Sequence, residues 1–173
     1  MSEINNSALD LIMTRRSVRK YTDQPVSDEQ LELLLSAACN APSSKSTHPT
    51  HFIVIKDKDK KLELSVMHGG SRALEQAPLA IIVCGDTSLS WACWRDDCAA
   101  ATMNIIFAAE ALGLSSCWCG IYPRDKRVDG FSKYLEIPGH IMPYSMIILG
   151  YADAPKNRRE GVVEKRIHRD ERW

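Results

Sequence analysis

The sequence predicts a single α+β domain, and three observations support this. The 173 residues are close to the size of one domain and suffice to bury a hydrophobic core. Helical periods and short apolar runs are intermixed along the chain, without the regular strand–helix alternation and glycine-rich phosphate turn of a Rossmann unit. No linker rich in Gly, Ser or Pro divides the chain and no internal repeat occurs, so residues 1–173 are expected to share one core.

The composition is that of an ordinary globular protein, with 45% hydrophobic and 25% charged residues. Lys plus Arg and Asp plus Glu both number 22, so no overall field favours nucleic acid or an acidic membrane surface. No apolar run approaches the roughly 18 residues of a membrane span, and the first residues lack the pattern of a secretory signal. We therefore expect a cytoplasmic protein whose six cysteines are reduced thiols.

Two helices are predicted in the N-terminal part. Residues Leu9, Ile12 and Met13 share helical spacing behind a cap at Asn6 or Ser7. A basic run follows this first helix. Further on, Ser27 and Gln30 form a capping box, from which a second helix extends to about Asn40. The apolar face of the second helix consists of Leu31, Leu34, Leu35 and Ala38.

A central strand is predicted in the middle of the chain. Residues 79–84 form a continuous apolar run between Pro78 and Gly85, which is the pattern of a strand covered on both faces. This strand is expected at the centre of the sheet. The elements before it are a strand, a charged turn and two helical pieces, at residues 52–55, 56–61, 62–67 and 71–76.

The longest helical pattern runs from Trp91 or Asp96 to Leu112 and is apolar almost all round. We expect this helix to be buried on most sides, with Gly113 as its C-terminal stop. Residues 113–120 then lead to a short strand. The remaining predicted elements are a helix, a strand and a charged tail, at residues 124–135, 144–149 and 151–173.

A basic cluster near the N-terminus suits a phosphate group. Guanidinium forks bind phosphate oxygens through paired hydrogen bonds, and alternate residues of an extended segment project to one side, so positions 15, 17 and 19 would share a ligand. A second basic group near the C-terminus could complete the same site. The residues concerned are Arg15, Arg16, Ser17 and Arg19, and then Lys156 and Arg158. The alternatives are a solvated basic turn and a solvated tail.

The loop at residues 42–49 offers hydroxyl groups and backbone amides at close spacing. Such groups hydrogen-bond the ribityl chain and ring edge of a flavin, although a polar connector would have the same composition. Metal chemistry is disfavoured, because Cys117 and Cys119 are spaced C-x-C without a companion pair. The five histidines show no metallohydrolase spacing, and the G-x-S-x-G, P-loop and G-x-G-x-x-G motifs are absent.

Five segments, taken in order, resemble the nitroreductase family, and the resemblance spans essentially residues 9–159. Each segment alone could recur by chance, but their order and intervals are specific. They are the basic run at 15–21, the Ala-Pro-Ser-Ser at 41–44 before a Pro-x-x-Phe strand, the Ala-rich helix from Asp97 into 111–118, the Leu-Gly-Tyr at 149–151 and the Lys-Asn-Arg at 156–158.

The resemblance implies a central, mostly antiparallel sheet flanked by helices, in an intertwined homodimer. It implies FMN as cofactor between the subunits, NAD(P)H as electron donor, and a nitroaromatic, quinone or similar small acceptor in a ping-pong reaction. Reductive dehalogenation and ene reduction are related alternatives, but no lid insertion is recognisable. The alternatives from other classes are a flavin-binding regulatory or storage protein and a flavin-free interaction module.

The resemblance also assigns residues to the FMN, while no side-chain acid or base is obligatory. The phosphate and ribityl chain would be held by Arg15, Ser17 and Arg19, with Arg16 as a further participant, and closed in by Lys156 and Arg158. The ring would be approached by Pro42, Ser43 and Ser44 of the partner subunit and lined by Trp118, Cys119 and Gly120. Ser46 and His48 replace the family's usual Asn and Gln, so Ser46 would reach the ring only through water or a shifted loop. We expect the 151–173 tail to pack on the partner subunit.

Overall fold

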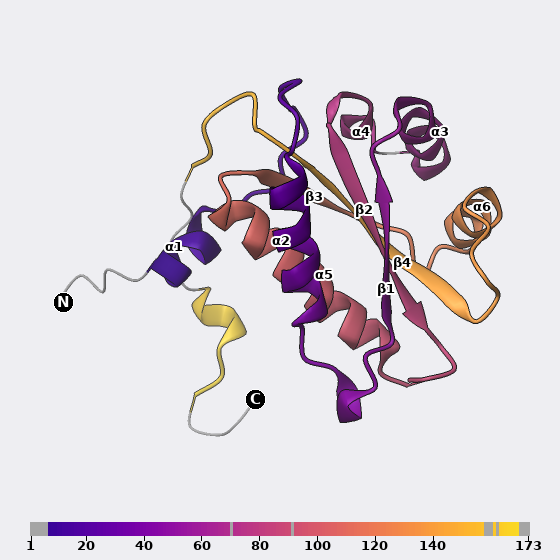
Figure 1. Cartoon of the computed structure of the whole chain (residues 1–173). Helices are drawn as coiled ribbons and strands as arrows, with labels where there is room; N and C mark the ends of the chain where they lie inside the picture. Colours follow the sequence, from indigo (N-terminus) through magenta and orange to yellow (C-terminus); the bar gives the residue numbers. More distant parts are fainter. Residues whose placement is uncertain (1–6, 70, 91, 158–160, 162, 170–173) are drawn as a thin grey trace.

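A four-stranded antiparallel sheet forms the centre of the molecule, as Figure 1 shows. The computed structural model describes residues 7–69, 71–90, 92–157, 161 and 163–169. Within these residues the strand order is β1-β2-β4-β3, and every neighbouring pair is antiparallel. The bounds are Thr50–Ile55 for β1, Leu79–Asp86 for β2, Ser115–Gly120 for β3 and Ile141–Gly150 for β4. The predicted α+β class with a mostly antiparallel sheet is confirmed.

Helices cover both faces of this sheet (Figure 1). On one face α2 and α5 pack together, and on the other lie α3, α4 and α6. The end of α1 contacts the end of α5, where Thr14 Oγ1 donates a hydrogen bond to Glu110 Oε1 at 3.2 Å. The helices are α1 (Ser7–Thr14), α2 (Asp28–Cys39), α3 (Lys58–His68), α4 (Ala73–Gln76), α5 (Trp94–Ala111) and α6 (Asp125–Tyr134), with 3-10 turns at Ser44–Ser46 and Glu164–Arg166.

The start of α2 shows why the local sequence fixes this helix. Gln30 N donates to Ser27 Oγ, and Ser27 N donates to Gln30 Oε1, both at 3.1 Å. This reciprocal pair satisfies two amides that a helix N-terminus otherwise leaves free. The predicted capping box is therefore confirmed, as is the predicted end, because Asn40 is the C-terminal cap.

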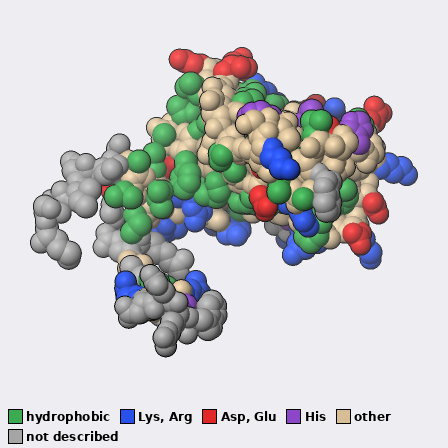
Figure 2. Space-filling view, turned by 90° about the horizontal axis from the view of Figure 1, so that it is seen from below, with side chains coloured by type: hydrophobic (Ala, Val, Ile, Leu, Met, Phe, Trp, Pro, Cys, Tyr) green, Lys and Arg blue, Asp and Glu red, His purple; other side chains and the backbone are tan. Residues whose placement is uncertain are grey.

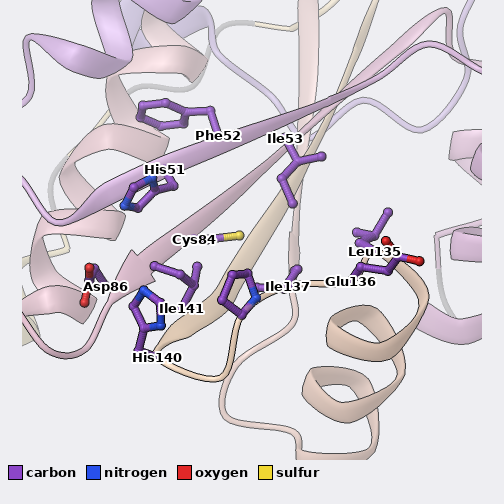
Figure 3. A pocket seen from close by; sticks show the side chains of 11 residues that line it. His51, Phe52, Ile53, Cys84, Asp86, Leu135, Glu136, Ile137, His140 and Ile141 are labelled. Carbon is purple, nitrogen blue, oxygen red and sulfur yellow. The ribbon is translucent and has the colours of Figure 1, made fainter.

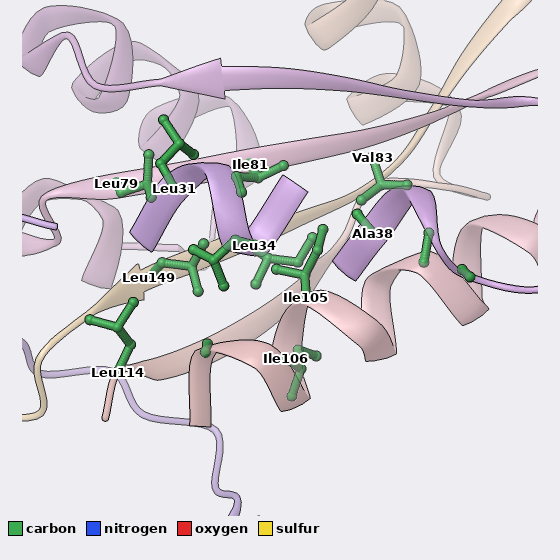
Figure 4. Close-up of a cluster of buried hydrophobic side chains, with 14 of the residues drawn as sticks. Leu31, Leu34, Ala38, Leu79, Ile81, Val83, Ile105, Ile106, Leu114 and Leu149 are labelled. Carbon is green, nitrogen blue, oxygen red and sulfur yellow. The ribbon is translucent and has the colours of Figure 1, made fainter. Parts of the chain in front are cut away.

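Strand β2 is buried along all 8 of its residues, as its apolar run predicts. Successive side chains of a strand point to opposite faces, so β2 contributes to two cores. Ile81 and Val83 pack with Leu34 of α2 and Ile105 of α5 in the core shown in Figure 4. The residues between them face α3, α4 and α6: they are Ala80, Ile82 and Cys84, which pack with Leu64, Leu74 and Phe131.

Helix α5 is enclosed within the chain itself, since none of residues 97–110 is exposed. This confirms the burial predicted from its apolar circumference. Three other expectations need correction. Residues 115–120 are themselves strand β3 rather than a lead to a strand, β4 begins at Ile141, and α3 begins at Lys58 inside the predicted charged turn. Helix α3 starts there because Asp57 Oδ1 caps it by accepting from Lys60 N at 2.8 Å.

Candidate functional site

A basic hollow of about 360 Å³ lies where the segment after α1 meets the segment after β4. Two backbone hydrogen bonds bring these distant segments together: Thr22 N donates to Tyr151 O at 2.9 Å, and Asp153 N donates to Lys20 O at 3.2 Å. We call this basic hollow the phosphate hollow. Its lining consists of Arg16, Val18, Arg19, Lys20, Ala154, Pro155, Lys156 and Asn157.

The structure brings together some of the predicted phosphate residues and not others. Arg16, Arg19 and Lys156 line the phosphate hollow, whereas Arg15 and Ser17 do not, and Arg158 lies outside the described residues. Positions 15, 17 and 19 therefore do not all line this hollow. The physical reason is that the segment is not a regular strand, since it leaves α1 and meets β3 through one isolated bridge at Ser17.

Two of the hollow's cations are held by hydrogen bonds within the chain. Arg16 Nη1 donates to the carbonyl oxygens of Met13 at 3.0 Å and Arg15 at 2.6 Å, at the end of α1. Lys156 Nζ lies 2.7 Å from both carboxylate oxygens of Glu110, which only the fold brings near. Positive charge still prevails, because Arg19 and Lys20 also line the hollow, so its chemistry suits an anion.

The outer edge of β3 adjoins this hollow, because Val18 lines the hollow and is bonded to Ser116 of β3. Ile121 N donates to Tyr144 O at 3.0 Å, and in an antiparallel pair only every second residue faces the partner strand. The amides of Cys117 and Cys119 therefore face β4, while those of Trp118 and Gly120 face the free edge. The edge is covered at Ser116 by Val18, and beyond that point it presents backbone donors beside the phosphate hollow.

Side chains on the two faces of β3 have different surroundings. Trp118 lies on the α5 face, 6.2 Å from the Tyr144 ring in an edge-to-face contact. Cys117 and Cys119 are buried on the α6 face. The thiol of Cys119 lowers the pKa of Cys117, with help from the Arg19 guanidinium, whereas that same contact and burial raise the pKa of Cys119. All six cysteines are free.

A cation also lies at the end of β3, where sequence reasoning expected none. Arg127 Nη1 of α6 donates to Gly120 O at 2.8 Å and lies 3.0 Å from His68 Nε2. His68 Nε2 is 3.0 Å from the same carbonyl oxygen. Burial and, next, the Arg127 charge lower the pKa of His68. No local motif marks these three residues, because they come from α3, β3 and α6.

The predicted 42–49 loop lies at the other end of α5. Ser44 N donates to the buried Asp97 Oδ1 at 2.9 Å, and His48 N donates to Ser43 Oγ at 2.8 Å. These bonds hold three non-glycine residues in the left-handed region, which costs energy. They are Lys45, Ser46 and His48, with φ angles of 52°, 55° and 44°.

Within a single chain, the 42–49 loop and the phosphate hollow lie too far apart to form one site. The loop is bonded to Asp97 near the start of α5, and the hollow is bonded to Glu110 near its end. At 1.5 Å per residue the two contacts are about 20 Å apart along the helix. The polar residues of the loop and the cations of the hollow therefore belong to two separate surfaces of the same chain.

A second hollow of about 400 Å³ lies between β1 and the turn after α6, as Figure 3 shows. Its walls include His51, Asp86 and His140 at one end and Ile53 and Leu135 towards the other. It contains none of the predicted site residues. Across the described parts of the chain, no three His, Cys, Asp or Glu side chains are grouped to hold a metal ion. Nor does any helix there have the length and apolarity needed to cross a membrane.

Comparison with known proteins agrees with this geometry. The sequence model of the nitroreductase family matches residues 12–82 and 63–151. A relative from Archaeoglobus fulgidus, provisionally named an NADH dehydrogenase/NAD(P)H nitroreductase, is 41% identical over 171 residues, which cover 95% of this chain and 98% of that protein.

Solved structures show the same likeness. A crystal structure from Parabacteroides distasonis, with the same provisional name, has a TM-score of 0.94 at 36% identity and covers 98% of this chain and 100% of its own. An FMN-dependent nitroreductase from Clostridium difficile has a TM-score of 0.89 at 33% identity, with 94% and 98% covered. The predicted resemblance is confirmed, and the chain belongs to the nitroreductase family.

Proposed function

We propose that this protein is an FMN-dependent oxidoreductase that takes hydride from NAD(P)H and passes electrons to nitroaromatics, quinones or similar small acceptors. The observation that carries the proposal is the phosphate hollow, which continues into the free edge of β3. A cationic pocket beside a row of backbone donors matches a ligand with a phosphate at one end and a polar ring at the other. The names of relatives support the cofactor and the donor, since they include an FMN reductase [NAD(P)H] from Bacillus subtilis.

The residues present fit FMN. Arg16, Arg19 and Lys156 would hold the phosphate, and the Trp118 and Gly120 amides would meet the ring edge. Arg15, Ser17 and Arg158 remain predicted contributors to the phosphate and ribityl chain, and Cys119 to the ring. When bound, the flavin supplies the hydride-accepting and electron-donating chemistry.

The residues of the chain would bind the flavin, orient its ring and shield the site from water. Backbone donors at the β3 edge and the Arg19 guanidinium would stabilise negative charge on the reduced ring, because fixed dipoles need no reorganisation during reaction. The aromatic group of Trp118, Tyr122 and Tyr144 would shield the α5 side of β3 from water. No side-chain acid or base is required, so we assign no catalytic residue. A ping-pong sequence follows if donor and acceptor use one ring face in turn.

A homodimer completes the proposed site. Since one chain keeps the 42–49 loop about 20 Å from its own phosphate hollow, Pro42, Ser43, Ser44 and Ser46 would serve the flavin of the partner subunit. Figure 2 shows hydrophobic side chains gathered on one half of the face seen from below. Exposed apolar residues on α1, α2 and the tail fit a subunit interface: Leu9, Ile12, Leu33, Val163 and Ile167.

This dimer gives the 151–173 tail a partner surface to pack on. A single domain over residues 1–173 and a cytoplasmic location remain predictions. Sedimentation analysis of the purified protein tests the dimer, and a monomer that binds FMN fully would contradict the shared site.

The deciding experiment is a visible spectrum of the purified full-length protein, followed by anaerobic titration with NADPH and with NADH. We expect a yellow protein that releases FMN on denaturation and bleaches on titration. A colourless protein that does not take up added FMN would overturn the proposal. Uptake of FMN without steady-state NAD(P)H oxidation would favour the storage or regulatory alternative, and intersecting rather than parallel double-reciprocal plots would exclude the ping-pong sequence.

A matched pair of variants tests the phosphate hollow. Arg19→Gln removes a cation from the hollow and is expected to weaken FMN binding by about tenfold, the scale of one charge-assisted hydrogen bond. Lys133→Gln removes an exposed cation from α6 and is expected to leave binding unchanged. Equal effects from the two variants would mean that only overall charge matters.

A further inference from the structure

The carbonyl of Gly120 is the meeting point of three elements. It lies at the end of β3 and accepts from Arg127 Nη1 at 2.8 Å, with His68 Nε2 3.0 Å away. Arg127 comes from α6 and His68 from the last residue of α3. The amide of Gly120 faces the same free edge as this carbonyl, because alternate residues of β3 face β4.

The protonation of His68 follows from its neighbour. His68 Nε2 lies 3.0 Å both from Arg127 Nη1, which can only donate, and from Gly120 O, which can only accept. A neutral ring can satisfy one of these two contacts through Nε2, and in either tautomer an uncharged imidazole lies beside the guanidinium. Burial, with the Arg127 charge, lowers the pKa of His68 in agreement. Arg127 thus supplies the charge at Gly120 O, and His68 orients the guanidinium.

The contact between His68 and Arg127 has a cost in folding stability. His68 Nδ1 is buried and has no hydrogen-bond partner among the described residues. An unpartnered buried polar nitrogen destabilises a fold, and such costs are commonly retained where a site needs them. The contact also places a cation on the carbonyl of Gly120, the residue whose amide is proposed to meet the flavin ring.

We propose that Arg127 is a positioning residue of the flavin site, which holds the Gly120 carbonyl at the β3 edge and favours the anionic reduced flavin over the oxidised form. The inference rests on the proposed function. Arg127 acts through Gly120 and through its charge, and His68 holds it in place. Charge placed beside a water-poor site acts more strongly than in bulk water, so the effect is expected to differ between the two redox states.

The test compares Arg127→Met, Arg127→Lys and the control Arg124→Met. Arg124 is exposed at the start of the same helix, and its substitution removes an equal charge. The readouts are the FMN absorption bands, the dissociation constant of oxidised FMN and the midpoint potential. We expect Arg127→Met to weaken binding of reduced FMN about tenfold more than that of oxidised FMN, Arg127→Lys to restore part of the difference, and Arg124→Met to match the unsubstituted protein.

Two results would overturn the inference: an unchanged potential and spectrum in Arg127→Met, or an equal shift in Arg124→Met. If Arg127→Met does not fold, His68 provides the second test. His68→Gln keeps an acceptor for Arg127 and is expected to retain the potential, whereas His68→Leu is expected to lower it, and equal potentials in the two would also overturn the inference. Failure of the proposed function is distinguishable, because it shows in the unsubstituted protein as absence of FMN uptake.

Discussion

Lys156 Nζ lies 2.7 Å from both carboxylate oxygens of Glu110, although the two residues are 46 positions apart in the chain. The side chain of Glu110 is 8% exposed and that of Lys156 is 21% exposed, so solvent screens this pair only partly. The pair joins the segment after β4 to the end of α5 and fixes one wall of the phosphate hollow. The Glu110 carboxylate also neutralises part of the positive charge that an anion in the hollow would meet.

Glu110→Gln is therefore expected to bind FMN more tightly, by about threefold to tenfold at low salt, because Lys156 loses a competing carboxylate. The same change is expected to lower the free energy of unfolding by about 1–2 kcal/mol, because a largely buried ion pair is broken. Fluorescence titration with FMN and urea unfolding measure the two effects. Glu32→Gln, at an exposed position of α2, is the charge-matched control. Weaker FMN binding in Glu110→Gln would show instead that the carboxylate orients Lys156 for the phosphate.

Gly150→Ala tests the packing between the end of β4 and the residues around it. A Cβ at this position would lie 2.6 Å from Pro78 Cδ and 3.1 Å from Tyr21 Cδ1, so the sheet or the proline must shift. We expect a loss of about 1–3 kcal/mol in the free energy of unfolding, measured in urea. Gly139→Ala is the control, since its Cβ meets nothing within 4 Å. Equal stabilities would contradict the close approach.

Glu136→Gly is expected to stabilise the protein by about 1 kcal/mol. Glu136 follows the C-terminal cap of α6 with φ of 54°, a left-handed conformation that favours glycine. The helix end is closed by Ile137 N donating to Ser132 O at 2.9 Å, so the conformation is built into the cap. Thermal unfolding measures the gain. Glu136→Ala keeps the Cβ and is expected to show no such gain, and a similar gain in both variants would assign the effect to the lost carboxylate.

The stability of the protein is expected to fall below about pH 6.5, partly because of His68. Burial and the neighbouring Arg127 lower the pKa of His68 in the folded state, so the unfolded chain binds the proton first as the pH falls. Its contribution is present above the ordinary histidine pKa and is lost as the pH falls towards the lower folded value. His68→Gln, which cannot titrate, should lose less stability between pH 7.5 and 5.5 in urea unfolding. An identical pH dependence in both proteins would contradict a neutral buried His68.

Much of the fold was predictable because several helices and strands are specified by residues close together in the sequence. The start of α2 follows from Ser27 and Gln30, which are close in sequence and satisfy each other's backbone groups. The central place of β2 follows from its unbroken apolar run, since only a strand covered on both faces can bury such a run. Strand β3 was misplaced because Ser115, Ser116 and the two cysteines give no alternation of apolar and polar residues.

The sequence by itself determined the chemistry that is available: a basic run after α1, a basic group after β4 and a polar loop after α2. It also determined the order of segments that identifies the family. These features are local, so a linear pattern contains them. The tertiary structure decided which of them meet. It joined Arg16, Arg19 and Lys156, paired Lys156 with Glu110, and set the 42–49 loop about 20 Å away at the far end of α5. It alone brought Arg127 and His68 to Gly120, because contacts between distant segments depend on sheet order and helix packing, which no short stretch of sequence encodes.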